Sequence, residues 1–142
     1  MKLFLDCEFT NFQGKLISMA LVAENGDEFY EVVPYRTYEC HSWVVENVLP
    51  ILNKDFILYE DFQIKLRKFL SKYDEIEVIA DWPEDFWHFT AALLTGPGEM
   101  MDCPKLTMTM ERRLNYVSSL PHNALNDAQA IMAGYMKKYG TV

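Results

Sequence analysis

Four carboxylates and one histidine are the residues of this chain with the clearest capacity for chemistry. Asp6 and Glu8 lie in an early apolar run, Asp85 lies in the middle of the chain, and His122 and Asp127 lie near its end. Carboxylates near a core are costly unless they are paired or bind a metal, and carboxylate groups that hold two hard divalent cations are the usual machinery of phosphoryl transfer. Histidine titrates near neutral pH and can take a proton from an attacking water. The set therefore predicts a two-metal hydrolytic site with a histidine base.

The first part of the chain is predicted to form three antiparallel strands, one of which carries two of these residues. Residues i and i+2 of a strand point to the same face, so Asp6 and Glu8 should project together while Cys7 faces the opposite side. Asn25 and Gly26 form a strong hairpin signal between two runs rich in β-formers. The expected strands of this meander cover residues 2–8, 16–24 and 27–35.

The rest of the chain alternates predicted helices with strands. Ser42 is a candidate N-cap, Pro83 suits a first helical turn, and Gly140 is a candidate C′ residue. Apolar spacing predicts helices over residues 42–52, 60–73, 83–94 and 123–139, the second of which should bury Phe62, Leu66, Phe69 and Leu70. Further strands are expected over residues 75–80 and around Met100–Asp102. Antiparallel strands followed by alternating helix and strand predict an α/β fold, a mixed sheet with helices on its faces.

The composition limits the classes of protein to which the chain can belong. Its 142 residues suit a single domain, 1–142, and half of them are apolar, which predicts a packed core rather than disorder. No apolar run reaches the ~18 residues that span a membrane, and the early acidic residues do not suit a signal peptide. The three cysteines are widely spaced without a zinc or disulfide pattern, so a reducing cytoplasm is the expected location.

The net charge of −8 bears on the kind of nucleic acid that the chain could bind. It argues against a long, salt-driven contact with a duplex, because nucleic-acid binders normally carry a basic footprint. A short substrate remains compatible, since cations held by the carboxylates would add positive charge where a phosphate arrives. Lys105, Arg112 and Arg113 form a basic cluster that suits either a phosphate contact or a solvated helix start.

Three segments of the chain, in this order, resemble the motifs of the DEDDh family of 3′–5′ exonucleases. LFLDCEFT (3–10) resembles the first motif, a hydrophobic strand followed by D-x-E-x-T, and HNALNDA (122–128) resembles the third, H-x-A-x-x-D-A. VIADWPEDF (78–86) resembles the middle motif with two departures, because Asp81 stands where Asn is usual and Glu84 stands where Phe is usual. The expected metal ligand in this motif is Asp85, whereas Asp81 is either a further acidic contributor or a helix cap.

The resemblance covers nearly the whole chain and implies a ribonuclease H-like fold, with the small single-domain exoribonucleases as the nearest relatives. The site residues that it implies are the metal ligands Asp6, Glu8, Asp85 and Asp127, the general base His122, and Phe9 and Thr10 at the 3′-terminal nucleotide. The implied cofactors are two divalent cations, Mg²⁺ or Mn²⁺. The implied reaction releases nucleoside 5′-monophosphates from single-stranded RNA or short oligonucleotides, with DNA also open as substrate. Relatives of this kind often form homodimers.

Two other classes of function remain open at the level of sequence. One is a catalytically silent binding module on the same fold, which would lack a ligand or the base. The other is an adaptor whose acidic residues form only a solvated surface. Each motif is weak alone, because D-x-E strands and H-x4-D pairs are common, but their joint order favours the nuclease.

Aromatic residues and methionines near the motifs also allow more than one interpretation. Trp82, Phe86 and Trp87 could stack on a base, but aromatic clusters beside a strand are more often core. Phe9 and Phe12 flank Thr10 and are the stronger candidates for stacking. Adaptable packing is the simplest expectation for the four methionines Met100, Met101, Met108 and Met110.

Overall fold

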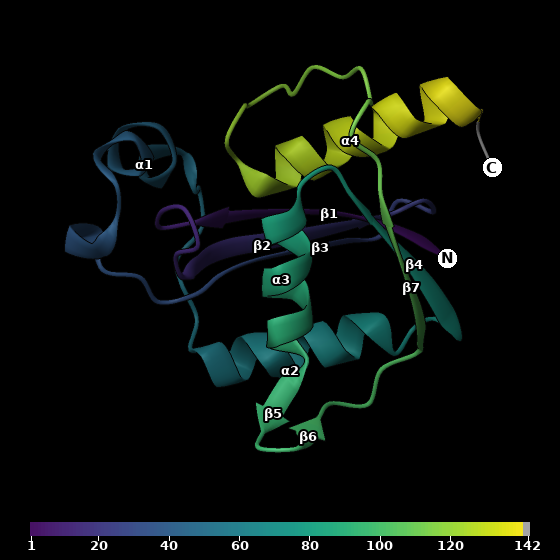
Figure 1. Cartoon of the computed structure of the whole chain (residues 1–142), viewed down its shortest axis with the longest axis horizontal. Coiled ribbons are helices and arrows are strands. Elements are labelled where there is room, and N and C mark those ends of the chain that lie inside the picture. The colour runs from purple at the N-terminus through teal and green to yellow at the C-terminus, as the bar shows by residue number, and fades with distance from the viewer. Residues whose placement is uncertain (141–142) are drawn as a thin grey trace.

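β1 lies at the centre of the sheet that organises the molecule. In the computed structural model, which describes residues 1–140, five strands lie in the order β3-β2-β1-β4-β7 and a separate two-stranded ribbon joins β5 to β6. The strands are β1 Lys2–Phe9, β2 Leu16–Ala23, β3 Glu28–Val32, β4 Glu75–Ala80, β5 Leu94–Gly96, β6 Glu99–Met100 and β7 Lys105–Met110. The α-helices are α1 Ser42–Asn47, α2 Tyr59–Leu70, α3 Pro83–Ala92 and α4 Ala124–Tyr139, and the 3-10 turns are η1 Thr37–Glu39 and η2 Leu49–Ile51 (Figure 1).

The strand directions confirm the predicted mixed α/β sheet. β2 pairs antiparallel with both β1 and β3, whereas β4 pairs parallel with β1 and β7 pairs parallel with β4. The predicted hairpin turn is present: Gly26 has φ +96°, and the Ala23 N–H donates to the Asp27 carbonyl at 2.8 Å. Glycine is favoured there because a left-handed backbone costs it little.

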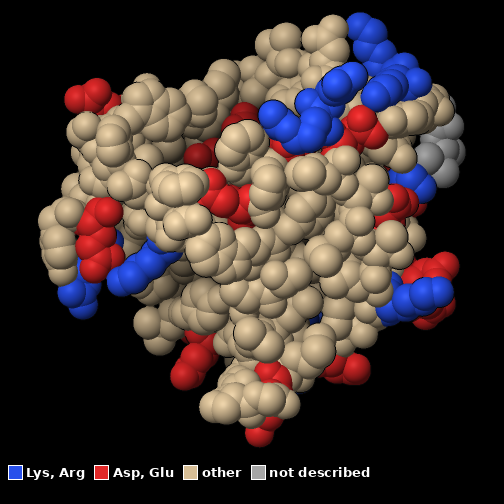
Figure 2. Space-filling model, viewed as in Figure 1, with Lys and Arg blue, Asp and Glu red and all other residues tan. Residues whose placement is uncertain are grey.

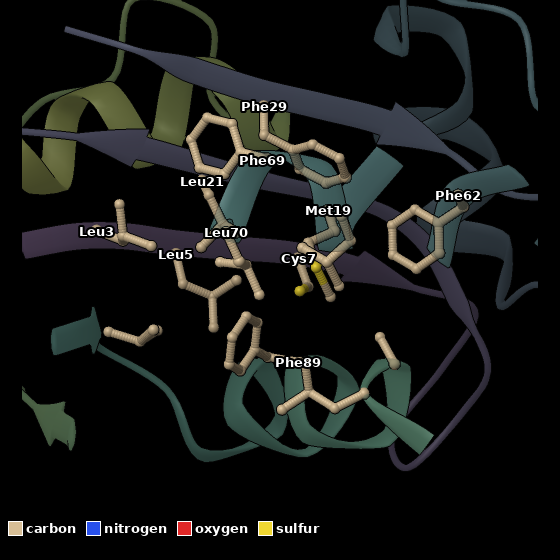
Figure 3. Close-up of a cluster of buried hydrophobic side chains, with 14 of the residues drawn as sticks. Leu3, Leu5, Cys7, Met19, Leu21, Phe29, Phe62, Phe69, Leu70 and Phe89 are labelled. Atoms are coloured by element: carbon tan, nitrogen blue, oxygen red, sulfur yellow. The ribbon is translucent and has the colours of Figure 1, made fainter. Parts of the chain in front are cut away.

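Each face of the sheet packs against its own helices. Along β1, alternate side chains point to opposite sides, so Leu3, Leu5 and Cys7 join the core under α2 and α3 (Figure 3). Phe4 points the other way and packs against Ile131 of α4. This placement confirms that Cys7 faces away from the two carboxylates beside it. Helices therefore cover both faces, and β1 emerges between them at its carboxyl end.

The two longest helices match the sequence pattern closely. The buried residues of α2 are Phe62, Leu66, Phe69 and Leu70, as the helical spacing predicts. Burial of such a side chain stabilises the fold by about 1.5–3 kcal/mol relative to exposure. The predicted final helix is also present: the Asn123 side chain accepts the Asn126 N–H at its start, and Gly140 ends it with φ +87°.

The predicted helix over 42–52 is shorter than expected. α1 ends at Asn47 and a 3-10 turn follows, because Pro50 has no N–H to donate back to the residue four positions earlier. The expected N-cap is also wrong. His41 fills that role instead of Ser42, since its Nδ1 accepts the Trp43 N–H at 3.1 Å.

The strand expected around Met100–Asp102 is misplaced. Only Met100 of that range lies in a strand, the two-residue β6, whereas the strand that joins the main sheet is β7, which starts at Lys105. β7 is an edge strand with little burial, so it lacks the apolar run that marks inner strands. Met101 packs in the core, whereas Met100, Met108 and Met110 are about half exposed.

Among residues 1–140, no helix combines the length and the apolar character needed to cross a membrane.

Candidate metal centre

The carboxyl ends of β1 and β4 bring acidic residues from four segments to one place. β1 and β4 are parallel neighbours, so their carboxyl ends lie at the same edge of the sheet. β1 carries Asp6 and Glu8, and Asp81 directly follows β4. Asp85 lies in the first turn of α3, and Asp127 lies in the first turn of α4. The starts of these two helices come from opposite faces of the sheet and meet at the end of β1.

The acidic side chains form two groups that share one residue. Asp6, Glu8 and Asp127 form one group, and Asp6, Asp81 and Asp85 form the other. Within each group, one carboxylate oxygen of every member lies within 4.8 Å of those of the others. All four predicted metal ligands are therefore brought together, and Asp6 is the member common to both groups. Asp81, whose role the sequence left open, belongs to the second group.

Burial and mutual repulsion raise the pKa values of these carboxylates. Burial is the largest cause for Asp6, followed by the charges of Asp85 and Glu8, and it raises the pKa of Asp6 well above its usual value. Burial, with the charges of Asp127 and Asp85, raises the pKa of Glu8 to about 9. Burial and the charge of Asp81 likewise raise the pKa of Asp85, although the Cys7 N–H opposes the shift. Burial also raises the pKa of Asp127, although the backbone N–H and the charge of His122 oppose the shift. Bound cations would lower the pKa values of the whole cluster.

The donor atoms of the cluster suit hard divalent cations. Every candidate ligand offers carboxylate oxygen, the donor that Mg²⁺ and Mn²⁺ prefer. Asp6 Oδ2 is buried and has no hydrogen-bond partner within the described chain, although a buried polar atom normally has one. A carboxylate shared by two groups suits two ions about 3.5–4 Å apart. The residues present therefore fit a two-ion site.

Hydrogen bonds hold Asp81 and Asp85 in their places. The Cys7 N–H on β1 donates to Asp85 Oδ1 at 3.1 Å, which fixes the start of α3 to β1. The Tyr116 hydroxyl donates to Asp81 Oδ2. Asp81 does not cap α3: the N-cap is Trp82, and no side chain accepts a hydrogen bond there. The helix-cap interpretation of Asp81 is therefore wrong.

His122 lies directly beside the group formed by Asp6, Glu8 and Asp127. Its backbone has φ +75°, and its N–H donates to Asp127 Oδ2 at 3.0 Å. Its ring meets the ring of Trp43 edge to face, with centroids 4.7 Å apart. The Asn123 side chain fixes the position of this turn, because its Nδ2 donates to the Ile51 carbonyl at 2.9 Å while its Oδ1 caps α4. The imidazole is thus held at the rim of the cluster.

A hollow of about 420 Å³ opens beside Glu8 and His122. We call it the first hollow; it is lined by Glu8, Phe9, Asn11, Phe12, His41, Trp43, Val44 and His122. Figure 2 shows acidic residues recessed at the start of α4, next to a largely uncharged surface. No sequence pattern places Trp43 at this site, because its helix lies far along the chain from every motif and has only six residues.

Phe9 and Thr10 occupy different environments. The Phe9 ring stacks on His88, with centroids 5.2 Å apart, and lines the first hollow. Thr10 is buried, and its hydroxyl accepts the Lys15 N–H at 3.0 Å. Its backbone N–H donates to the Lys15 carbonyl, and its carbonyl accepts the His41 N–H, both at 2.9 Å. Thr10 thus shapes the loop between β1 and β2 and ties it to α1.

The two tryptophans around the middle motif are not core residues. Trp82 and Trp87 are 45% and 50% exposed, so the packing interpretation is wrong for both. With Phe12, they line a second hollow of about 390 Å³ between the β1–β2 loop and α3. Phe86 is the member of this aromatic trio that packs against the core.

Comparison with known proteins adds no assignment. No protein-family model matches the chain, and no curated protein matches it. The residues of the acidic cluster and their geometry are therefore the basis on which a function can be assigned.

Proposed function

We propose that the protein is a divalent-metal-dependent 3′–5′ exonuclease of the DEDDh type. Its substrate is single-stranded RNA or a short oligonucleotide, and its product is a nucleoside 5′-monophosphate. The observation that carries this proposal is the membership of Asp6 in both carboxylate groups. A carboxylate that belongs to both groups could bridge two neighbouring cations, and nucleases are among the enzymes that use two-cation sites.

The architecture is compatible with a ribonuclease H-like fold, which forms part of the proposal. Three antiparallel strands are followed by two parallel ones, with helices against both faces. Asp6, Asp85 and Asp127 lie on β1, α3 and α4, the elements expected to carry the three motifs.

Asp6, Glu8, Asp85 and Asp127 would hold two Mg²⁺ or Mn²⁺ ions, with Asp81 as an additional acidic contributor. Such ions lower the pKa of bound water and stabilise the charge of a leaving oxygen. The chain contributes the fixed positions of the oxygens: Asp85 is held by the Cys7 N–H, and Asp127 by the His122 N–H.

His122 accepts the proton of the attacking water in this proposal. The edge of the Trp43 ring limits the orientations of the imidazole, and the backbone of the same residue is bonded to Asp127. Proton transfer to a positioned side chain typically contributes about 10²–10⁴ in rate. Phe9 and Phe12 would line the position of the terminal base in the first hollow, and Thr10 holds the loop that carries them.

The first experiment identifies the reaction and its polarity. Single-stranded RNA and DNA heptamers, labelled at either end, are incubated with the protein and Mn²⁺ or Mg²⁺, and the products are separated on a gel. We expect stepwise shortening from the 3′ end, release of nucleoside 5′-monophosphates, and complete loss of activity in EDTA. A matched pair of variants excludes a contaminating nuclease: Asp6→Asn should be inactive, whereas Asp61→Asn, on the exposed side of α2, should act like the wild type.

Two results would contradict the proposal. One is full activity in excess chelator or in Asp6→Asn. The other is an intact heptamer after incubation of the folded wild-type protein with either metal. Tight binding without cleavage would instead support the silent binding module.

A further inference from the structure

The second hollow lies across Phe12 from the first. Its lining residues are Phe12, Gln13, Trp82, Pro83, Glu84 and Trp87. Phe12 is 77% exposed and lines both hollows, so they are neighbours on either side of one aromatic ring. The first hollow lies beside Glu8, whereas Trp82 of the second directly follows Asp81. The first hollow therefore adjoins the group of Asp6, Glu8 and Asp127, and the second is lined by the segment that carries Asp81 and Asp85.

Glu84 joins the two segments that form the second hollow. Its Oε2 accepts the Gln13 N–H at 2.8 Å, and its Oε1 accepts the Trp82 Nε1–H at 3.1 Å. Both carboxylate oxygens are thus engaged, and the loop that carries Phe12 is fixed to the start of α3. In this chain Glu84 stands where the DEDDh motif has Phe, so the departure from the motif has a structural use. It holds two exposed aromatic rings in place around an open hollow.

Basic side chains continue from the second hollow along the surface. The Arg112 guanidinium lies 5.0 Å from the centroid of the Trp82 ring, and its Nη1 donates to the Asp81 carbonyl at 2.7 Å. Lys138 of α4 pairs with Glu111 at 3.0 Å, which brings the last turn of α4 beside this segment. Figure 2 shows a run of blue side chains over the β7–α4 connection and the end of α4.

Arg113 and Lys137 are the cations of this run that remain available. Both are exposed, and within residues 1–140 neither lies within 4.0 Å of a carboxylate oxygen. In a chain of net charge −8, a concentration of cations beside exposed aromatic rings is a local reversal of charge. Exposed rings stack on nucleobases without regard to sequence, and neighbouring cations neutralise phosphates.

We propose that the second hollow and the adjoining basic run bind the part of the single strand that lies 5′ of the scissile phosphate. This proposal rests on the exonuclease function and adds the route of the substrate. The 3′-terminal nucleotide occupies the first hollow, and the next base stacks against Trp82, Trp87 and Phe12. The phosphates beyond it pass Arg112 and continue towards Arg113 and Lys137. The protein therefore recognises a strand several nucleotides long, and a mononucleotide makes only part of the contacts.

The test compares the binding of a long and a short ligand. Dissociation constants for a labelled RNA heptamer and for a nucleoside 5′-monophosphate are measured with Mn²⁺, by fluorescence anisotropy and by calorimetry, in a His122→Ala background. Trp87→Ala should reduce the preference for the heptamer about 10-fold, because stacking on one aromatic ring is worth about that much. The matched control is Phe56→Ala, which removes a ring of similar exposure (55%) beside β3. It should leave the preference unchanged, and a DNA heptamer should show the same pattern.

The basic run has an independent readout that does not depend on the aromatic rings. Arg113→Ala and Lys137→Ala should each reduce the slope of log Kd against log salt by about 0.7, the value for one phosphate contact with a single strand. Lys68→Ala, an exposed position on α2, is the control. Unchanged heptamer preference in Trp87→Ala, or unchanged slopes in both basic variants, would overturn the proposal.

Failure of this proposal can be told apart from failure of the proposed function. If the wild type shortens the heptamer but the variants bind it normally, the exonuclease stands and the route is wrong. If the wild type binds the heptamer through Trp87 and Arg113 but never cleaves it, the route stands and the exonuclease is wrong.

Discussion

The two sides of the acidic cluster contain similar residue types but differ in the chemistry that they can support. On the His122 side, Glu8 and Asp127 lie beside the edge-to-face pair of Trp43 and His122. On the Arg112 side, the carboxylates are Asp81 and Asp85. They lie beside Trp82 and Arg112, and the Arg112 guanidinium is close to the indole ring. Each side thus combines two carboxylates, an exposed tryptophan and a side chain, histidine or arginine, that can carry positive charge.

The difference between the two sides lies in this side chain, which is His122 on one side and Arg112 on the other. Histidine gains and loses a proton near neutral pH, whereas the arginine guanidinium is permanently charged. The His122 side is therefore suited to proton transfer, and the Arg112 side to neutralising phosphate charge. Asp6 belongs to both sides, so in the proposed reaction the chemistry and the substrate path would meet at one carboxylate.

The largest expected effect is a difference in kcat/KM between variants of Asp85 and Asp81, the two carboxylates of the Arg112 side. Asp85→Asn should lower kcat/KM at least about 10³-fold, because cation binding supplies several kcal/mol of transition-state stabilisation. Asp81→Asn should cost less than about 10-fold, since its amide oxygen can still accept the Tyr116 hydroxyl and the DEDDh motif that this segment resembles has Asn there. Steady-state cleavage of the heptamer measures both. The reverse ranking would mean that the middle motif is misaligned by four residues.

The second effect tests the His122 side. His122→Ala should turn over at least about 10²-fold more slowly, the lower end of what general-base catalysis contributes. Binding of two Mn²⁺ ions, measured by calorimetry, should persist, because the Asp127 side chain accepts from the backbone N–H of residue 122, which alanine retains. Loss of metal binding in this variant would make the histidine a ligand or a structural support instead of a base.

A smaller effect, mainly on KM, is expected when the positive charge of Arg112 is removed. Arg112→Met should raise KM roughly 10-fold with a lesser change in kcat, because a hydrogen bond to a charged group is worth about that much. Arg112→Lys should recover part of the loss by restoring the charge. A fall in kcat as large as that of His122→Ala would show that both sides take part in the chemical step, and the distinction between them would be lost.

The smallest effect concerns the stability of the metal-free protein. Burial raises the pKa of Glu8 from its ordinary value of 4.5 to about 9, so the folded state binds this proton more tightly than the unfolded state. The resulting stabilisation is complete below about pH 4.5 and is lost as the pH rises through about 9. In EDTA, the melting temperature should therefore fall as the pH is raised from 5 to 9.

Two comparisons sharpen that measurement. Glu8→Gln cannot ionise and should flatten the pH dependence, whereas Glu60→Gln, at an exposed position of α2, should not. Addition of Mn²⁺ should also flatten the curve, because bound cations compensate the carboxylate charge. A melting temperature that rises with pH in the metal-free wild type would contradict the burial of these carboxylates.

The amount that the sequence could predict differs between the two sides. The placement of Asp6 and Glu8 on one face of a strand, and of Asp127 in the first turn of α4, follows from local periodicity and capping. Trp43 could not be assigned, because nothing in a short helix predicts which distant turn it will contact. β7 was misplaced for a related reason: an exposed edge strand carries little apolar pattern.

By itself, the sequence determined the mixed sheet and the buried face of α2, because periodicity, turn chemistry and residue type are local properties. The ligands Asp6, Glu8, Asp85 and Asp127 were expected from the resemblance to the DEDDh motifs. Only the tertiary structure decided that Asp6 is shared between two groups, that Asp81 joins one of them, and that Trp43 lies beside His122 whereas Trp82 lies beside Arg112. These relations depend on the parallel register of β1 with β4 and on the packing of α3 and α4 against opposite faces of the sheet. Contacts between segments up to about 120 positions apart arise from that packing, and no local pattern encodes them.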